Sequence, residues 1–212
     1  MATFQQEQST ARGGNLEGIA IMVAGIMLLP LMDVIAKYVA TFEGMAPGQV
    51  AFYRFFFQLL ATIPAVLAVG GVAALRPRRF WLNMLRGCLL GAASLLFFTA
   101  IKYMPLADSV AIFFVEPFIL TALSALVLGE RVGWRRWTAI AVGFIGAIIV
   151  INPSFARFGS VALLPLATAT LFAVYMLLNR ALGRVDSPLV MQLVAGVGGS
   201  LLLGLVLFGG GT

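Results

Sequence analysis

The chain has 212 residues, of which 61% are hydrophobic and only 10% are charged, and its formal net charge is +6. An ordinary soluble domain has about 25% charged residues, so this composition indicates an integral membrane protein instead. Histidine is absent and Cys88 is the single cysteine, which excludes histidine-based acid–base chemistry, the usual zinc ligand sets and an internal disulfide. We therefore expect no metal site, and most enzyme functions lack the residues they would need.

The first 16 residues are polar and contain no apolar core followed by a cleavage site, so we expect a short cytoplasmic tail and no signal peptide. After this tail, apolar segments of about 20 residues, the length needed to cross a bilayer, recur along the chain. They predict an all-α integral membrane protein with about seven transmembrane helices, at residues 18–39, 49–69, 87–103, 109–128, 132–151, 160–178 and 189–208.

Basic residues are distributed unevenly between the two sides of this expected bundle. With the N-terminus inside, ten of the 14 Lys and Arg residues fall in cytoplasmic segments and only three near the outer ends of spans. Cytoplasmic loops of membrane proteins carry such an excess of basic residues, so the net positive charge is explained by the membrane topology. We therefore expect no nucleic-acid partner. We expect a multi-pass protein of the inner (cytoplasmic) membrane with a cytoplasmic N-terminus.

Charged residues stand inside three of the expected spans at a common depth. Counted at about 1.5 Å per residue, Asp33, Arg54 and Glu116 each lie roughly 8–10 Å from the outer end of their span. Lys37 follows Asp33 by one helical turn, and Gln58 follows Arg54 in the same way. Intramembrane charges are costly and usually paired or functional. These side chains either form structural pairs that fix helix packing or line a cavity open to the outside, and we favour the cavity as a site of substrate binding or coupling.

Prolines interrupt several of the expected spans. Pro117 directly follows Glu116, and Pro30 lies in the first span. A proline inside a helix removes one backbone hydrogen bond, here leaving the carbonyl near Phe113 without its donor. Freed groups of this kind are tolerated where they face a cavity or another helix. Pro30 and Pro117 are therefore candidates for helix kinks or gating points.

The sixth expected span repeats the polar positions of the first. At an offset of 142 residues, Asp33 falls on Tyr175 and Lys37 falls on Asn179. Five spans separate the two copies, so the sixth span enters the membrane from the side opposite to the first. Inverted repeats of this kind are the architecture of many secondary transporters. Tyr175 and Asn179 therefore join the candidate substrate-binding residues.

The segment LRGCLLGAASLLFFTAIKYMPLADSVAIFFVEPFILTALSALVLGERVGWRRWTAIAVGFIGAIIVINP, residues 85–153, carries the pattern of a known family. This segment, together with Arg54, resembles the first EamA domain of the drug/metabolite transporter superfamily. The matching elements are Arg54, the turn at 100–107, Pro117, the Gly–Glu pair at 129–130 and the glycine-rich fifth span. The resemblance implies ten spans in two inverted five-span repeats, transport by alternating access, and no cofactor.

On this resemblance the chain divides into a tail (1–16), a first EamA domain of five spans (17–151) and the first two spans of a second EamA domain (159–212). We expect a form truncated after about seven spans. The stretches DVIAK (33–37) and PGQVAFYRFFFQLLATIP (47–64) are similar to members described as carriers of nucleoside-like metabolites or vitamins. Substrate, direction of transport and coupling ion stay open.

The leading functional prediction is a secondary active transporter for a small metabolite or drug-like molecule. In it, Glu116 or Asp33 binds a coupling proton or a cationic group, and Arg54 is an anion contact or counter-ion. A seven-helix receptor or retinal protein is a second class, but its light-driven form is excluded because the last expected span, 189–208, has no lysine for a Schiff base. A membrane-embedded enzyme would need a nucleophile or metal cluster, and the spans offer only scattered Ser and Thr. A non-transporting fragment, or a subunit completed by a partner chain such as a homodimer, is the remaining alternative.

Overall fold

The computed structural model describes residues 34–39, 41–70, 77–129, 132–151, 158–183 and 185–209. Its described part is built from helices without strands, so the expected all-α class is confirmed. Asp33 and Pro30 lie outside the described residues, as does most of the first expected span. The helices are α2 (Pro47–Gly70), α3 (Phe80–Tyr103), α4 (Leu106–Phe113), α5 (Glu116–Leu128), α6 (Trp134–Ile151), the short 3-10 helix η2 (Gly159–Ala162), α8 (Leu163–Leu182) and α9 (Pro188–Gly209).

Within the described chain, five helical segments are long and apolar enough to cross a membrane. One of them combines α4 and α5, and another joins η2 to α8, so short interruptions do not prevent a segment from reaching full length. Their presence supports the reading of the chain as a multi-pass membrane protein. The five segments are Pro47–Ala68, Phe80–Tyr103, Leu106–Leu128, Gly159–Leu182 and Pro188–Gly209.

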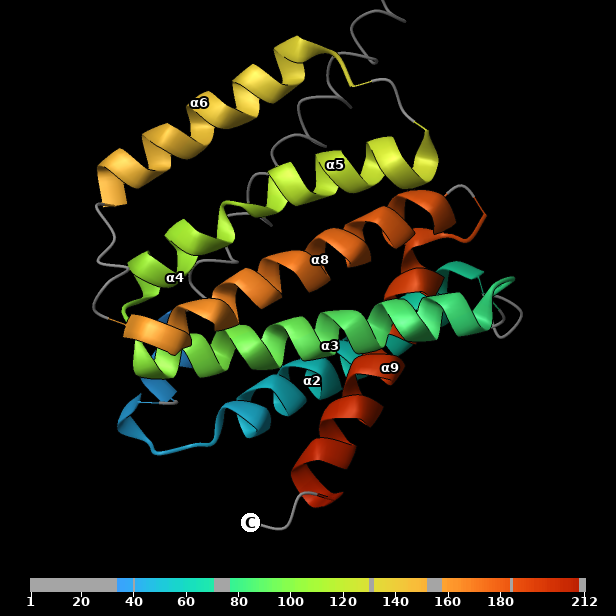
Figure 1. The fold of residues 1–212 in the computed structure, drawn as a ribbon. Helices are drawn as coiled ribbons and strands as arrows, with labels where there is room; N and C mark the ends of the chain where they lie inside the picture. The colour runs from blue at the N-terminus through green and yellow to red at the C-terminus, as the bar shows by residue number, and fades with distance from the viewer. Residues whose placement is uncertain are drawn as a thin grey trace, which may run out of the picture.

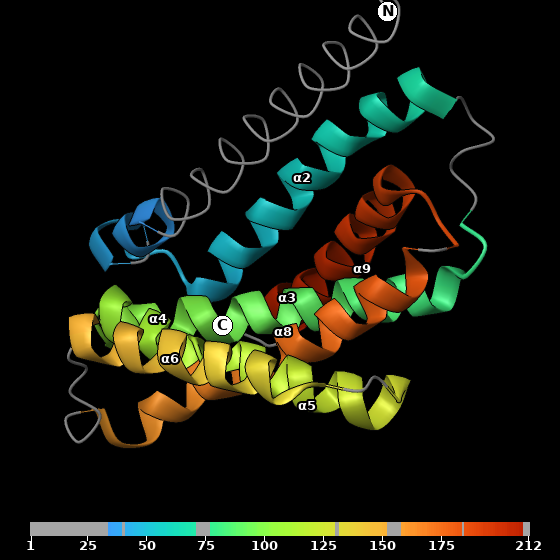
Figure 2. The ribbon, with the colours of Figure 1, turned by 90° about the horizontal axis from the view of Figure 1, so that it is seen from above.

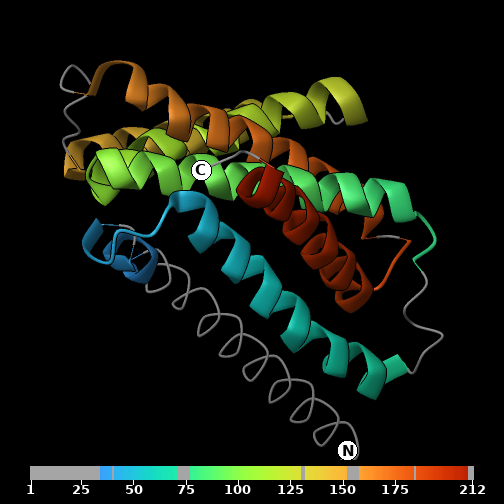
Figure 3. The same ribbon diagram turned by 90° about the horizontal axis from the view of Figure 1, so that it is seen from below.

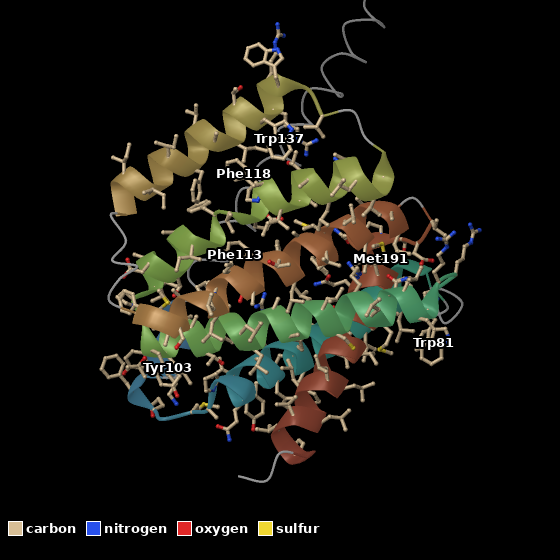
Figure 4. All side chains as sticks on the ribbon, viewed as in Figure 1. Trp81, Tyr103, Phe113, Phe118, Trp137 and Met191 are labelled. Atoms are coloured by element: carbon tan, nitrogen blue, oxygen red, sulfur yellow. The ribbon has the colours of Figure 1, made fainter. Side chains whose placement is uncertain are left out.

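Successive helices run back and forth between two ends of the bundle (Figure 1). Trp81 and Tyr103 mark opposite ends of α3 (Figure 4), and we name the two ends of the bundle after them. The turn before α3 and the connection between α8 and α9 lie at the Trp81 end, whereas the α3–α4 turn lies at the Tyr103 end.

Helices that are distant in sequence are neighbours in space. α8 lies between α3 and the α4–α5 pair, and α6 lies outside α4 and α5 (Figure 1). α2 and α9 lie on the opposite side of α3 from α6, as the views from above and below show (Figures 2 and 3). The central helix α3 therefore contacts α2, α8 and α9, which come from both halves of the expected repeat.

Small residues allow α3 and α9 to approach closely. A Cβ atom added at Gly87 would lie 2.6 Å from the carbonyl oxygen of Ala195, and one added at Gly91 would lie 3.1 Å from the Cα atom of Gly199. Such contacts between small residues are the usual way in which membrane helices pack, because they bring the two backbones together. Next to this seam, Phe55 of α2 fills the space in front of Gly199 and is fully buried.

The boundaries of two spans differ from those expected. α3 begins at Phe80, seven residues before the start predicted from hydropathy, so Arg86 belongs to the helix rather than to a loop. The fourth span begins at Leu106 and is divided into α4 and α5. At the start of α3, the polar residues that interrupt the apolar pattern find hydrogen-bond partners within the fold.

Candidate functional site

The break between α4 and α5 places Glu116 and Pro117 at the start of a helix. α4 ends at Phe113, and α5 begins at Glu116 with Pro117 in its first turn. Proline is well tolerated there, since its missing N–H would have no helical partner and its fixed φ suits the first turn. The carbonyl oxygen of Val115 accepts a hydrogen bond from the N–H of Phe118 at 3.1 Å and so begins the new helix.

Glu116 itself is half-buried at this break. Its Oε1 atom is buried and has no hydrogen-bond partner among the described residues. A buried carboxylate oxygen without a donor costs free energy, although the positive end of the α5 dipole offsets part of it. The segment around the break packs on α8 (Figure 1). Glu116 is thus a carboxylate group with unused hydrogen-bonding capacity inside the bundle.

Arg54 and Gln58 occupy one face of α2. Arg54 donates a hydrogen bond from Nη1 to Oγ of Ser94 on α3 at 3.2 Å, and its guanidinium carbon lies 5.8 Å from the ring centroids of both Phe55 and Phe98. Arg54 also has an interaction beyond these contacts. One turn further, Nε2 of Gln58 is buried without a hydrogen-bond partner among the described residues. The α2 face predicted to be polar therefore points into the bundle.

Lys37 caps the end of α3. Its Nζ atom donates to the carbonyl oxygens of Ile101 at 2.8 Å and Met104 at 3.0 Å. The last carbonyl groups of a helix lack partners within the helix and carry partial negative charge, so an ammonium group is favoured there. This contact gives Lys37 a structural role, and its predicted role in substrate binding stays a prediction.

Tyr175 and Asn179 of α8 meet at Arg86 of α3, a residue that sequence reasoning had assigned to a loop. The guanidinium donates from Nη1 to Oδ1 of Asn179 at 2.6 Å and from Nη2 to the carbonyl oxygen of Met191. Its central carbon lies 5.3 Å from the centroid of the Tyr175 ring. Arg86 is only 2% exposed, and its Nε atom has no hydrogen-bond partner among the described residues.

A row of aromatic rings connects this arginine with the α4–α5 break. The ring of Tyr175 is 5.4 Å from that of Phe172, which is 5.5 Å from the ring of Phe113, and Phe113 is 6.1 Å from Phe97. These centroid distances are typical of interacting aromatic pairs. Figure 4 labels Phe113, which lies between α4 and α8. We call Phe97, Phe113, Phe172 and Tyr175 the aromatic row.

The structure thus distributes the predicted residues over several places. Tyr175 and Asn179 come together, while Arg54 and Gln58 lie on α2 and Glu116 lies at the α4–α5 break. The described contacts do not join Arg54 to Glu116, so their predicted common cavity with Asp33 stays a prediction. The described residues contain no group of three or more His, Cys, Asp or Glu side chains arranged to hold a metal ion.

Comparison with known proteins identifies the family. The model of the EamA-like transporter family matches residues 16–152 of this chain. The chain belongs to the EamA-like transporter family. This membership confirms the resemblance to the drug/metabolite transporter superfamily that the sequence motifs carried.

Several curated relatives of this EamA chain are named as metabolite transporters. A riboflavin transporter of Vibrio cholerae is 29% identical over 83% of the chain and 59% of its own length. An S-adenosylmethionine uptake transporter of Rickettsia prowazekii is 28% identical over the same shares of the two chains. A riboflavin transporter of Brucella anthropi is 30% identical over 79% of the chain and 58% of its own length. The chain therefore spans somewhat more than half of these relatives.

A solved crystal structure has the same fold. Its TM-score is 0.62 at 24% sequence identity, and the match covers 89% of this EamA chain and 67% of the other. At this identity the likeness concerns the fold alone. The apolar helices and the family match together support a multi-pass membrane protein.

Proposed function

We propose that this chain forms the substrate-handling part of a secondary active transporter, which moves a small metabolite across the cytoplasmic membrane by alternating access. The observation that carries the proposal is the half-buried Glu116 at a helix break, with a buried oxygen that no described residue satisfies. At this break Phe114 and Val115 keep helical dihedral angles, while bonds to the third residue back, such as that from Val115 to Ile112, interrupt the α-helical ladder. Interruptions of the ladder within a membrane segment are tolerated where protein or a water-filled cavity surrounds them. Broken helices of this kind are where many transporters bind substrate or coupling ions.

Glu116 has the chemistry for either of two roles at this break. As a carboxylate it can accept hydrogen bonds from a cationic or amide-bearing substrate, and in its protonated form it can carry a coupling proton. Arg54 of α2 bonds Ser94 of α3, and we propose that it contacts an acidic or carbonyl group of the substrate. Under this proposal the N-terminus is cytoplasmic, and the Trp81 end of the bundle faces the cytoplasm.

We further propose that the substrate carries a planar heteroaromatic ring. The aromatic row supplies ring faces and edges from α3, α4 and α8 beside the helix break. Aromatic side chains favour offset-stacked or edge-on contact with another ring. The riboflavin and S-adenosylmethionine transporters among the relatives are named for molecules that both contain such a ring system. Riboflavin and S-adenosylmethionine are therefore the first substrates to test.

The test is uptake of radiolabelled riboflavin and S-adenosylmethionine by proteoliposomes that contain the purified chain. We expect uptake of one of the two above that of empty liposomes, and a loss of at least tenfold on Glu116→Gln because the substitution removes the charge and the titratable proton. Glu43→Gln is the matched control, since Glu43 is exposed at the Tyr103 end and lies outside the candidate site.

Two results would contradict the proposal. The first is Glu116→Gln protein that is folded and transports at the rate of the Glu43→Gln control across a range of pH values. The second is absence of uptake of both probes, and of binding to them, by the chain and by a form completed with a second repeat. Uptake by the 212-residue chain would be followed by measuring its oligomeric state, which tests the expected homodimer.

A further inference from the structure

Polar contacts cluster where α3 meets the α8–α9 connection, at the Trp81 end of the bundle. Asn83, in the first turn of α3, donates from Nδ2 to Oδ2 of Asp186 at 2.8 Å. The other carboxylate oxygen of Asp186 accepts the backbone N–H of Arg78 at 2.8 Å. Asn83 is 0% exposed and Asp186 is 8% exposed, so this contact is shielded from solvent.

Arg86 adds a second contact across the same boundary. It lies one turn after Asn83 and donates to Asn179 near the end of α8 and to the carbonyl oxygen of Met191 near the start of α9. Met191 and Trp81 mark this region in Figure 4. These bonds join α3 and the turn before it to α8, to α9 and to the connection between those two helices.

Two buried polar atoms at this contact between α3 and the α8–α9 region lack hydrogen-bond partners in the described part of the chain. Oδ1 of Asn83 and Nε of Arg86 are buried without hydrogen-bond partners among the described residues. Each would gain a bond to water if the end of α3 moved away from α8 and α9, and the direct bonds would be exchanged for bonds to water at small net cost. The free-energy difference between the closed and the opened arrangement is thereby kept small, which is the property that a switching element needs.

A close backbone contact lies just beyond these bonds, toward the middle of the membrane. Gly87 faces Ala195, and Gly198 faces the carbonyl oxygen of Met84, where an added Cβ atom would be 2.7 Å away. Two backbones in contact without intervening side chains can rotate against each other with few rotamer changes. The seam of small residues is therefore suited to act as the pivot of a movement that opens the Trp81 end.

We propose that Asn83, Arg86, Asn179 and Asp186 form a latch that holds the Trp81 end of the bundle closed and releases it during transport. This assignment rests on the proposed function, because it gives the movement its purpose. In the closed arrangement the latch shields the interior from the side that the topology assigns to the cytoplasm. Release separates α3 from α8 and α9 and admits water to the latch residues and to the seam beside them.

The only cysteine of the chain is placed to report this release. Cys88 lies two residues after Arg86, is half-buried, and has its Sγ atom 3.5 Å from the carbonyl oxygen of Gly198 on α9. A thiol at this seam is protected from a bulky reagent while the end is closed. Its alkylation rate in detergent, measured by mass spectrometry with a water-soluble maleimide, follows the fraction of molecules in which the end is open.

Weakening the latch is expected to accelerate alkylation of Cys88. Asn83→Ala removes the side chain that donates a hydrogen bond to Asp186. Asp186→Asn leaves one acceptor oxygen, whereas the carboxylate uses one oxygen to accept from Asn83 and the other to accept from Arg78. We expect the rate to rise about threefold to tenfold in each variant, tenfold corresponding to about 1.4 kcal/mol in the closed-to-open equilibrium. Thr99→Val is the matched control, because it removes a hydroxyl bond within α3 itself, to the carbonyl oxygen of Leu95.

A reporter at the other end separates latch release from general loosening. Ser109→Cys in a Cys88→Ala background places a thiol at a fully buried position of α4 near the Tyr103 end. The latch variants should leave its alkylation rate unchanged. Circular dichroism and gel filtration verify that each variant is folded. If Asn83→Ala does not fold, the more conservative Asp186→Asn is used to test the latch.

The outcomes distinguish the latch from the proposed transport. Equal Cys88 rates in the wild type and a folded latch variant would overturn the latch, and so would equal acceleration at positions 88 and 109. No substrate is present in the experiment. Acceleration confined to Cys88 in a protein that neither binds nor transports the ring-containing probes would support the latch and overturn the proposed function alone.

Discussion

Replacing Gly87 with alanine tests the packing of α3 against α9 directly. An alanine Cβ atom at this position would lie 2.6 Å from the carbonyl oxygen and 2.8 Å from the Cα atom of Ala195. Both are backbone atoms of a neighbouring helix, so no side-chain rotation relieves the overlap. The two helices have to separate by several tenths of an ångström to about 1 Å, a shift of the kind that accompanies an overpacked core.

The expected magnitude follows from two opposing effects. Alanine is favoured over glycine inside a helix by about 0.8–1 kcal/mol, whereas overpacking typically costs about 1–3 kcal/mol and occasionally more. The shift also strains the bonds that the adjacent Arg86 forms with Asn179 and Met191. We therefore expect a net destabilisation of about 1–3 kcal/mol, which for a chain of this length lowers the melting temperature by roughly 2–12 °C.

Two other glycines provide the scale for the measurement. A Cβ atom at Gly91 would meet the Cα atom of Gly199 at 3.1 Å, so Gly91→Ala should be destabilising but less so than Gly87→Ala. Gly143 of α6 is exposed and meets no described atom within 4 Å, so Gly143→Ala should be neutral or slightly stabilising. Thermal unfolding of the purified variants in one detergent gives the order. A Gly87→Ala protein as stable as Gly143→Ala would refute the close approach of α3 and α9.

Two further predictions concern Lys37 and the topology. Lys37→Met should lower stability by about 1–3 kcal/mol in the same assay, because it removes a charged donor from the carbonyl groups at the end of α3, while Lys37→Arg should retain most of it. Unchanged stability with lost uptake would instead indicate a role in substrate binding. In a Cys88→Ala background, Glu43→Cys should react with an impermeant maleimide in intact cells, and Arg79→Cys should not. Labelling of position 79 from outside would show that the predicted topology is wrong.

Hydropathy predicts the transmembrane segments of this chain because most residues of a span meet lipid or other apolar side chains. It misplaced the start of α3, where the sequence RPRRFWLNMLRG is too polar to score as a span. Arg86 is buried there nevertheless, since Asn179 and Met191 supply acceptors from helices that lie about a hundred residues further along the chain. A hydropathy scale assigns each residue a free-energy cost of transfer into the membrane that is independent of its neighbours. It therefore contains no information on hydrogen-bond partners from distant parts of the chain.

The site illustrates the same limit. Counting residues along a helix gives the depth of a side chain in the membrane but not the direction in which it points. Tyr175 and Asn179 were selected through an internal repeat, and the structure places both against Arg86 of α3. The signal that could have identified Arg86 was its position one turn after Asn83, which aligns two polar side chains on one face of α3. Similarly, Pro117 predicted an interruption, but the sequence did not show that α5 starts anew at Glu116.

The polar contacts of α3 suggest why this helix, rather than a more apolar one, stands at the centre. Ser94 bonds Arg54 of α2, Arg86 bonds α8 and α9, and the last carbonyl groups accept the bonds of Lys37. Each of these bonds can be replaced by a bond to water, whereas separating an apolar interface of the same area would expose surface at a cost proportional to that area. A helix that has to change neighbours during transport is therefore better held by a few polar contacts and close glycine packing than by large interlocking side chains. Under the proposed latch, α3 is the element whose movement would link opening at the Trp81 end to the environment of Arg54, which bonds Ser94 of α3.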